Sequence, residues 1–296
     1  MSRITRRALL IGAGSVVIVG GAAAAAGVEA GILPGRSTLH RALGLDGPAG
    51  EVPDVSTGPF VSGSFSSERR GGIDTGWSIS YPPGFDDGDS LPVLIVLHGA
   101  HDNHADAFGS RLGLDRFLAA AVNDGVTPFA IAAVDGGDTY WHARESGEDS
   151  GAMVTDEFIP LLAQNGLDTS RIALLGWSMG GYGALLIGGR LGPGRVASIV
   201  ASSPALWPRA ADAAAIAYDS PDDYSASTVY GRQRQLRDIP VRIDCGSGDG
   251  FAHNVEAYIN TLDPAPEGGI TAGGHDMAYW RRVAPEQLVF VGEHFA

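Results

Sequence analysis

The chain of 296 residues contains 34 acidic and 20 basic residues, which gives a net charge of -14 at pH 7. Nucleic-acid binding relies on basic side chains that neutralise phosphates, so this charge disfavours a nucleic-acid partner. Every basic residue is an arginine, and the absence of lysine excludes a Ser-Lys dyad, a Schiff base and a Walker lysine. The single cysteine, Cys245, excludes an intrachain disulfide, as suits a protein exported already folded.

The N-terminal residues predict export. Arg6 and Arg7 precede a mild, Gly- and Ala-rich apolar stretch that runs to Val28, which is typical of a twin-arginine export signal. Residues 1–30 are therefore expected to be this signal, with cleavage after Ala30, or else an uncleaved signal anchor. The rest of the chain is then secreted or associated with the cell envelope, and any membrane contact runs through an uncleaved anchor. Neither a cleaved signal nor an uncleaved anchor determines the oligomeric state.

Residues 31–58, rich in Gly, Pro and short polar side chains, predict a flexible linker without a core of its own. Residues 59–296 predict one catalytic domain of α/β class, with a mostly parallel, doubly wound sheet and helices on both faces. Such sheets bind ligands at the carboxyl ends of their strands.

The predicted strands of this domain fall into two kinds. Alternating residues at 60–66 and 77–81 predict antiparallel strands at a sheet edge. Continuous apolar runs predict buried parallel strands at 91–97, 129–134, 172–175 and 196–200, and a late strand is predicted at 240–245. Helical patterns between them cover 114–122, 153–163 and 251–262.

The most informative motif is Gly176-Trp-Ser178-Met-Gly180, which joins the apolar strand 172–175 to an apolar helix. A nucleophile elbow needs a sharp strand-to-helix turn that lifts a serine hydroxyl out of the backbone, and flanking glycines leave room for it. The five-letter pattern alone is weak in a chain with 43 glycines, but its place at a strand-helix junction is specific. Ser178 is the predicted nucleophile, and a Gly-rich turn without chemistry is the alternative.

An acid and a base follow in the chain order Ser, Asp, His that α/β-hydrolases use. Asp249 lies in the loop after the last predicted strand and is the expected acid, whereas Asp244 is its rival within the strand. His275 lies in a glycine-containing loop before a terminal helix and is the expected base. His253 is too close to Asp249 to arrive from a separate loop, and His294 sits in the last residues.

The oxyanion of an acyl-transfer intermediate needs backbone donors near the serine. The apolar run 91–97 leads into His98-Gly-Ala100, which predicts the amides of Ala100 and Met179 as the two donors, with Gly99 as an alternative to Ala100. His98 precedes the donor, so it is expected to fix the loop by hydrogen bonding rather than to react.

Aromatic residues beside these positions predict a substrate pocket, unless they only pack helices against the sheet: Trp141, Trp177, Phe251 and Trp280. The segment 205–210 is a candidate cap over the site. His101 and His104 lack the signal of a third ligand and are expected to be solvated, so neither a metal nor a cofactor is predicted.

Four motifs together resemble the "putative esterase" group of α/β-hydrolases, which includes esterase D type enzymes and secreted mycolyltransferases. They are Leu97-His-Gly99, Gly176-Trp-Ser-Met-Gly180, Cys245-Gly-Ser-Gly-Asp249, and Gly273-Gly-His275 with Tyr279-Trp280. The resemblance covers roughly residues 75–296 and implies the α/β-hydrolase fold and a cofactor-independent serine esterase or acyltransferase. The Gly180-Gly-Tyr182 sequence is closer to general esterases, and mycolyltransferases usually have Glu as the acid.

The expected function is therefore that of an exported serine esterase, which hydrolyses a small-molecule or cell-envelope carboxylic ester through an acyl-enzyme. Transfer of the acyl group to a sugar or lipid hydroxyl is an alternative that uses the same site. A non-catalytic cell-envelope binding protein with the same fold is a third possibility.

Overall fold

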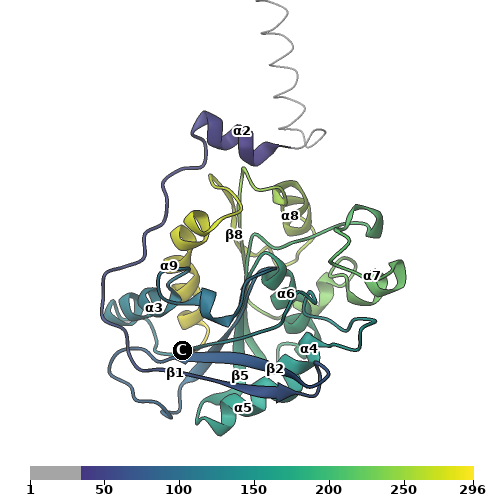
Figure 1. Ribbon diagram of the computed structural model, residues 1–296. Helices are drawn as coiled ribbons and strands as arrows, with labels where there is room; N and C mark the ends of the chain where they lie inside the picture. The colour runs from purple at the N-terminus through teal and green to yellow at the C-terminus, as the bar shows by residue number, and fades with distance from the viewer. Residues whose placement is uncertain (1–34) are drawn as a thin grey trace, which may run out of the picture.

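The computed structural model describes residues 35–296, so the predicted export signal and the first residues of the predicted linker lie outside the described part. One eight-stranded sheet forms the centre of the molecule, in the order β1-β2-β4-β3-β5-β6-β7-β8 (Figure 1). The strands are β1 (Phe60–Ser67), β2 (Ile73–Ser80), β3 (Pro92–Leu97), β4 (Ala130–Val134), β5 (Asp168–Trp177), β6 (Val196–Ser202), β7 (Val241–Gly246) and β8 (Glu267–Thr271).

The sheet is mostly parallel, as predicted. Strand β2 pairs antiparallel with both β1 and β4, and every other neighbouring pair is parallel. The two predicted edge strands and the five other predicted strands are confirmed. Strand β8 was not predicted, because its Glu-Gly-Gly-Ile-Thr sequence has neither an apolar run nor an alternation and none of its residues is buried.

Helices cover both faces of this sheet (Figure 1). The helices of the described residues are α2 (Arg36–Leu43), η1 (His104–Ala107), α3 (Leu114–Asn123), α4 (Ser150–Met153), η2 (Val154–Phe158), α5 (Ile159–Gln164), α6 (Met179–Leu191), η3 (Ala210–Asp212), α7 (Pro221–Ser227), η4 (Gln233–Leu236), α8 (Ala252–Ile259) and α9 (Met277–Glu293). The predicted helix 153–163 is the run α4-η2-α5, widened to a π-turn just before Pro160, which has no amide to donate to the preceding turn. Between residues 35 and 296, no helix has the length and apolar character needed to cross a membrane.

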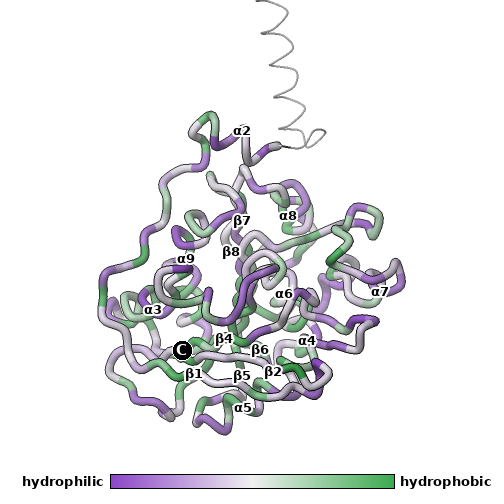
Figure 2. The backbone as a smooth tube through the Cα atoms, viewed as in Figure 1, coloured by the Kyte–Doolittle hydropathy of each residue, from purple (hydrophilic) through white to green (hydrophobic). Residues whose placement is uncertain are grey.

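Two hydrophobic cores lie on opposite faces of the sheet. Along β3, Val93, Ile95 and Leu97 belong to one core and Leu94 and Val96 to the other, because successive side chains of a strand point to opposite faces. The first core includes apolar residues of α6 and α8, and the second includes those of α3 and α9. Figure 2 shows hydrophobic segments in the interior strands and hydrophilic segments in the outer loops. The doubly wound architecture is therefore as predicted.

Residues 35–58, which were predicted to belong to a flexible linker, contact the domain at several points. After α2, the chain runs along the side of the molecule past α9 and α3 to β1 (Figure 1). The amide of Gly50 donates to the carbonyl of Ala278 at 2.8 Å, and Val52 packs beside Gly113. The composition of this segment did not reveal that its backbone bonds to the domain.

Candidate active site

Ser178 lies at the sharp turn between β5 and α6. Its backbone has φ 55° and ψ -118°, a conformation that non-glycine residues rarely adopt. A Cβ atom on Gly176 would overlap the carbonyl of Gly180, and one on Gly180 would overlap the carbonyl of Leu97. Only glycine therefore fits at either position. The amide of Ser178 donates to the carbonyl of Ser202 at 2.9 Å, which ties the turn to β6.

A chain of hydrogen bonds joins the three residues predicted as nucleophile, base and acid. His275 Nε2 is 2.9 Å from Ser178 Oγ, and His275 Nδ1 is 2.8 Å from Asp249 Oδ2. Asp249 is 1% exposed, and the amide of Phe251 donates to its Oδ1 at 2.8 Å. Because a carboxylate only accepts, Nδ1 carries the ring proton, and Nε2 of the neutral ring accepts from the serine hydroxyl. The arrangement is suited to removing the proton of Ser178.

The rival acid, Asp244, is engaged elsewhere. Its two carboxylate oxygens accept from the guanidinium of Arg242 at 2.9 and 3.0 Å, and one of them also accepts from Gln287 Nε2 at 2.7 Å. Asp244 therefore braces β7 against α9, whereas Asp249, in the loop that leaves the strand, meets the histidine.

The loop after β3 is held by a buried histidine. His98 Nδ1 donates to the carbonyl of Gly99 at 2.7 Å, and Nε2 accepts from the amide of Gly136 at 2.9 Å. Burial lowers the pKa of His98, which keeps the ring neutral and matches these two roles. Among the hydrogen bonds of residues 35–296, none engages the amide of Ala100 or Met179. The role of both amides as oxyanion donors stays a prediction.

Two of the four predicted pocket aromatics contact the histidine. The ring of Trp280 lies edge-on to His275 with centroids 5.2 Å apart, and that of Phe251 lies 5.5 Å away. Trp280 is 6% exposed and Phe251 is partly exposed, so the two flank the ring that meets Ser178.

The other two, Trp141 and Trp177, are 0% and 1% exposed, so their prediction as pocket walls is wrong. The Nε1 of Trp141 donates to the carbonyl of His98 at 3.3 Å, and the Nε1 of Trp177 donates to Asp102 Oδ2 at 2.9 Å. Both rings thus fix the loop that carries Ala100. Sequence patterns cannot separate a supporting aromatic from a lining one, because both follow strand ends.

The predicted cap segment 205–210 is part of a longer connection, which we call the cap. It spans residues 203–240 between β6 and β7 and contains η3, α7 and η4. Its first residues are tied to the site, since the amide of Ala205 donates to the carbonyl of Ser178 at 3.0 Å. Trp207 of the cap contacts Phe251 with ring centroids 5.3 Å apart, which links the cap to the aromatic side of the histidine.

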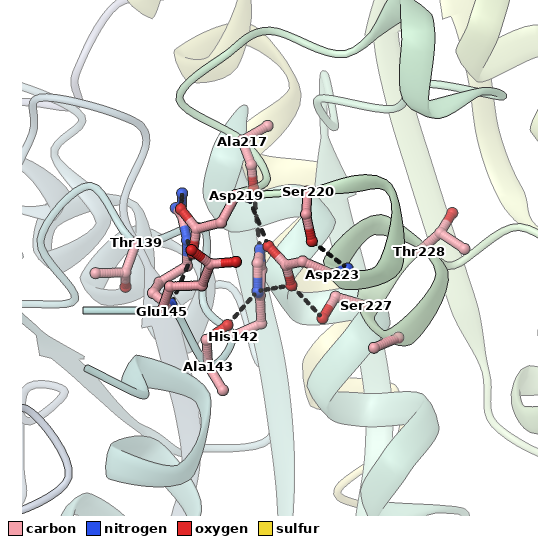
Figure 3. Close-up of polar contacts among 12 residues, drawn as sticks. Thr139, His142, Ala143, Glu145, Ala217, Asp219, Ser220, Asp223, Ser227 and Thr228 are labelled. Carbon is pink, nitrogen blue, oxygen red and sulfur yellow. Dashed lines mark hydrogen bonds and ion pairs between the residues drawn. The ribbon is translucent and has the colours of Figure 1, made fainter. Parts of the chain in front are cut away.

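Polar contacts hold the cap to the loop that follows β4 (Figure 3). His142 is fully buried, with Nδ1 at 3.3 Å from Asp223 Oδ1 and Nε2 at 3.0 Å from the carbonyl of Ala217. Arg144 donates to both carboxylate oxygens of Asp219, at 3.0 and 2.6 Å. Sequence reasoning missed this junction, because its residues are more than 70 positions apart.

His101 and His104 each contact a different aspartate. His101 Nδ1 is 2.8 Å from Asp138 Oδ2, and His104 Nδ1 is 2.8 Å from Asp135 Oδ1. In the described part of the chain, no group of three or more His, Cys, Asp or Glu side chains is arranged to hold a metal ion.

Solved structures with the same architecture define the class. The chain is similar to a ferulic acid esterase, with 20% identity, a TM-score of 0.68, and coverage of 80% of this chain and 98% of that one. It is also similar to an S-formylglutathione hydrolase from Agrobacterium tumefaciens, with 21% identity, a TM-score of 0.63, and coverage of 82% and 99%. A fluorophosphonate-binding serine hydrolase F of Staphylococcus aureus matches with 16% identity, a TM-score of 0.63, and coverage of 80% and 99%. The molecule thus has the α/β-hydrolase fold.

The family follows from the sequence itself. The family model described as "Putative esterase" matches residues 70–288, and the chain belongs to this family. None of the curated proteins compared with it matches the chain. The protein is an ester-hydrolysing enzyme.

Proposed function

We propose that the protein is an exported carboxylesterase in which Ser178, His275 and Asp249 act as a catalytic triad. The observation that carries the proposal is the hydrogen-bonded chain from Ser178 Oγ through both nitrogens of His275 to the buried Asp249. Export is supported by the twin arginine ahead of an apolar stretch at the start of the sequence.

In the proposed acylation step, His275 Nε2 takes the hydroxyl proton of Ser178 as the serine oxygen attacks the ester carbonyl. The carbonyl oxygen becomes an oxyanion that accepts from the amides of Ala100 and Met179. Asp249 stabilises the imidazolium, which then gives its proton to the departing alkoxide. The alcohol leaves, and the acyl group stays on Ser178 as an ester.

Deacylation repeats the same steps with water. His275 takes a proton from a water molecule as the water oxygen attacks the acyl carbon, and the same amides hold the oxyanion. When the tetrahedral intermediate collapses, the imidazolium protonates the Ser178 oxygen and the carboxylic acid leaves. No metal or cofactor takes part in this scheme.

The substrate panel starts from the activities of the similar structures. One is a ferulic acid esterase and another an S-formylglutathione hydrolase, so hydroxycinnamate esters and acyl thioesters join short- and long-chain p-nitrophenyl esters in the panel. The two rings beside His275, Phe251 and Trp280, favour esters with a planar or apolar group near the carbonyl.

The deciding experiment compares the wild type with Ser178→Ala on this panel and treats both with a serine-directed phosphonate. We expect turnover and labelling of the wild type only, with the same circular dichroism spectrum for both proteins. Equal turnover by the two proteins, or an unlabelled folded wild type, would sink the proposal. An added alcohol that is acylated in preference to water would identify the transferase alternative.

A further inference from the structure

We infer that residues 36–50 form a strap that positions the loops of the acid and the base, and that Arg282 is the positioning residue that holds this strap in place. The inference rests on the proposed function, because it concerns the turnover of the Ser178 site. The acid loop is residues 246–250, which carry Asp249, and the histidine loop is residues 271–276, which carry His275.

The two loops are bonded to each other. The amide of Ser247 donates to the carbonyl of Thr271 at 2.6 Å, and the amide of Gly248 donates to the carbonyl of Gly273 at 2.8 Å. Since these bonds flank Asp249 on one side and His275 on the other, a shift of either loop changes the distance between the two side chains.

The strap covers the acid loop directly. A Cβ atom on Gly248 would lie 2.8 Å from the Cβ of His40 and 3.0 Å from the carbonyl oxygen of Gly273. His40 is 5% exposed, so α2 packs on the backbone beside Asp249 at the point where the two loops meet. Figure 1 shows α2 above the end of the sheet where β8 and α8 lie.

Arg282 joins the strap to the histidine loop. Its Nη1 donates to the carbonyls of Asp46 at 3.0 Å and Pro48 at 2.5 Å, and its Nη2 donates to the carbonyl of Ala272. The guanidinium lies 5.1 Å from the centroid of the Tyr279 ring. A planar group with five donors can bridge these carbonyls at once, which the single ammonium of a lysine does less well.

A substitution at Gly50 can displace the strap without changing any residue of the catalytic domain. Its amide bonds to the carbonyl of Ala278, and a Cβ at this position would overlap the backbone of Arg281 and Arg282. A valine therefore forces the strap away from α9. Ala49, the preceding residue, is exposed, so Ala49→Val is the matched control.

The experiment measures kcat and KM of the full chain for the Gly50→Val, Arg282→Ala, Arg282→Lys and Ala49→Val variants with the best ester of the panel. Reactive sites are counted by phosphonate titration, so that misfolded protein is not included. We expect Gly50→Val and Arg282→Ala to lower kcat per site about 10- to 100-fold with KM within about 3-fold, since a misplacement of about 1 Å costs up to about 100-fold in rate. Arg282→Lys should lie between Arg282→Ala and the wild type.

If Gly50→Val and Arg282→Ala both act by displacing the strap, their effects on kcat are not additive. The kcat of the double variant should then lie within about 2-fold of the kcat of the slower single variant. If both single variants have the wild-type kcat per titrated site and differ only in having fewer reactive sites, the inference is overturned. The strap and Arg282 would then only stabilise the fold. If Gly50→Val does not fold, the comparison of Arg282→Ala and Arg282→Lys with the wild type tests the inference. If wild type and Ser178→Ala are equally inert, the proposed function fails instead.

Discussion

Asp249 and Asp244 lie five positions apart and make different contacts, which leads to opposite predictions for the same substitution. Asp249→Asn replaces an acceptor of the His275 Nδ1 proton by an amide that can turn a donor toward it. We expect kcat to fall by about 10³ to 10⁴, the scale seen when a triad aspartate becomes asparagine, with little change in the unfolding midpoint. Steady-state kinetics on the best ester checks this.

Asp244→Asn is the matched control. It removes the charge that pairs with Arg242, a side chain that is 10% exposed, and leaves that guanidinium without its buried, two-pronged partner, with only the exposed Glu286 still at 2.6 Å. We expect a loss of about 3 kcal/mol in the free energy of unfolding and an unchanged kcat per phosphonate-titrated site. Loss of turnover in Asp244→Asn but not in Asp249→Asn would reverse the assignment of the acid.

His98 predicts an acid-sensitive stability. Burial lowers the pKa of its imidazole below the ordinary value of 6.5, so the unfolded chain binds this proton at a higher pH than the folded chain does. The neutral ring thus stabilises the fold fully above about pH 6.5, and this contribution is lost as the pH falls below that value. We expect the urea midpoint of the wild type to drop from pH 8 to pH 5, and to drop less in His98→Asn. A variant that loses as much stability as the wild type over this range would contradict the prediction.

At the scale of elements, the junction between the cap and the loop after β4 predicts a change in substrate binding. The hydrogen bonds from Arg144 lower the pKa of Asp219 to about 2, so this ion pair persists in mild acid. Arg144→Ala removes the ion pair that holds the cap to this loop. The cap can then move, and with it Trp207, which contacts Phe251. We expect KM to rise about 10-fold, equal to about 1.4 kcal/mol, with a smaller effect on kcat.

Arg209→Ala is the control for this prediction, since Arg209 pairs with Asp212 on the outer surface of the cap with a side chain that is 77% exposed. Its KM should match that of the wild type. Equal effects of the two arginine variants would show that cap charge, rather than the junction, governs binding.

Sequence patterns predicted the elements in which burial gives all residues, or alternate residues, the same apolar character. A strand such as β4 is buried on both faces, so every residue is apolar and the run is visible. Strand β8 pairs only with β7 at the sheet edge, and its ladder bonds come from the backbone, which leaves no side-chain signal. The cap was underestimated for a related reason, because α7 and η3 are short and mostly exposed.

For the whole molecule, the two cores predict additive stability effects across the sheet. Leu185 of α6 is 1% exposed in one core, and Leu288 of α9 is 0% exposed in the other. We expect each leucine-to-alanine change to lower the free energy of unfolding by about 2 to 5 kcal/mol, and the double variant to show the sum within about 0.5 kcal/mol. Urea denaturation followed by tryptophan fluorescence measures all three, and a shortfall well beyond that margin would indicate that the cores are coupled.

The candidate site was predictable as far as local motifs extend. The elbow at Ser178, the loop acid and the loop histidine each follow a strand or precede a helix, and the order of a known fold brings them together. The support of these residues was not predictable, because bonds such as that from Arg282 to Asp46 join segments 236 positions apart through backbone carbonyls. Backbone acceptors are identical at every position, so sequence carries no trace of which one is used.

The course of α9 has a practical consequence for attaching the protein to a support. This helix begins beside His275 and runs back along the sheet, so that Phe295 packs against Phe129, just before the start of β4. Residue 35, in contrast, adjoins α2 above the acid loop. A tag on the C-terminal side is therefore expected to lie at the opposite end of the parallel strands from Ser178, whereas a bulky partner fused just before residue 35 is expected to lie on the side of the acid loop.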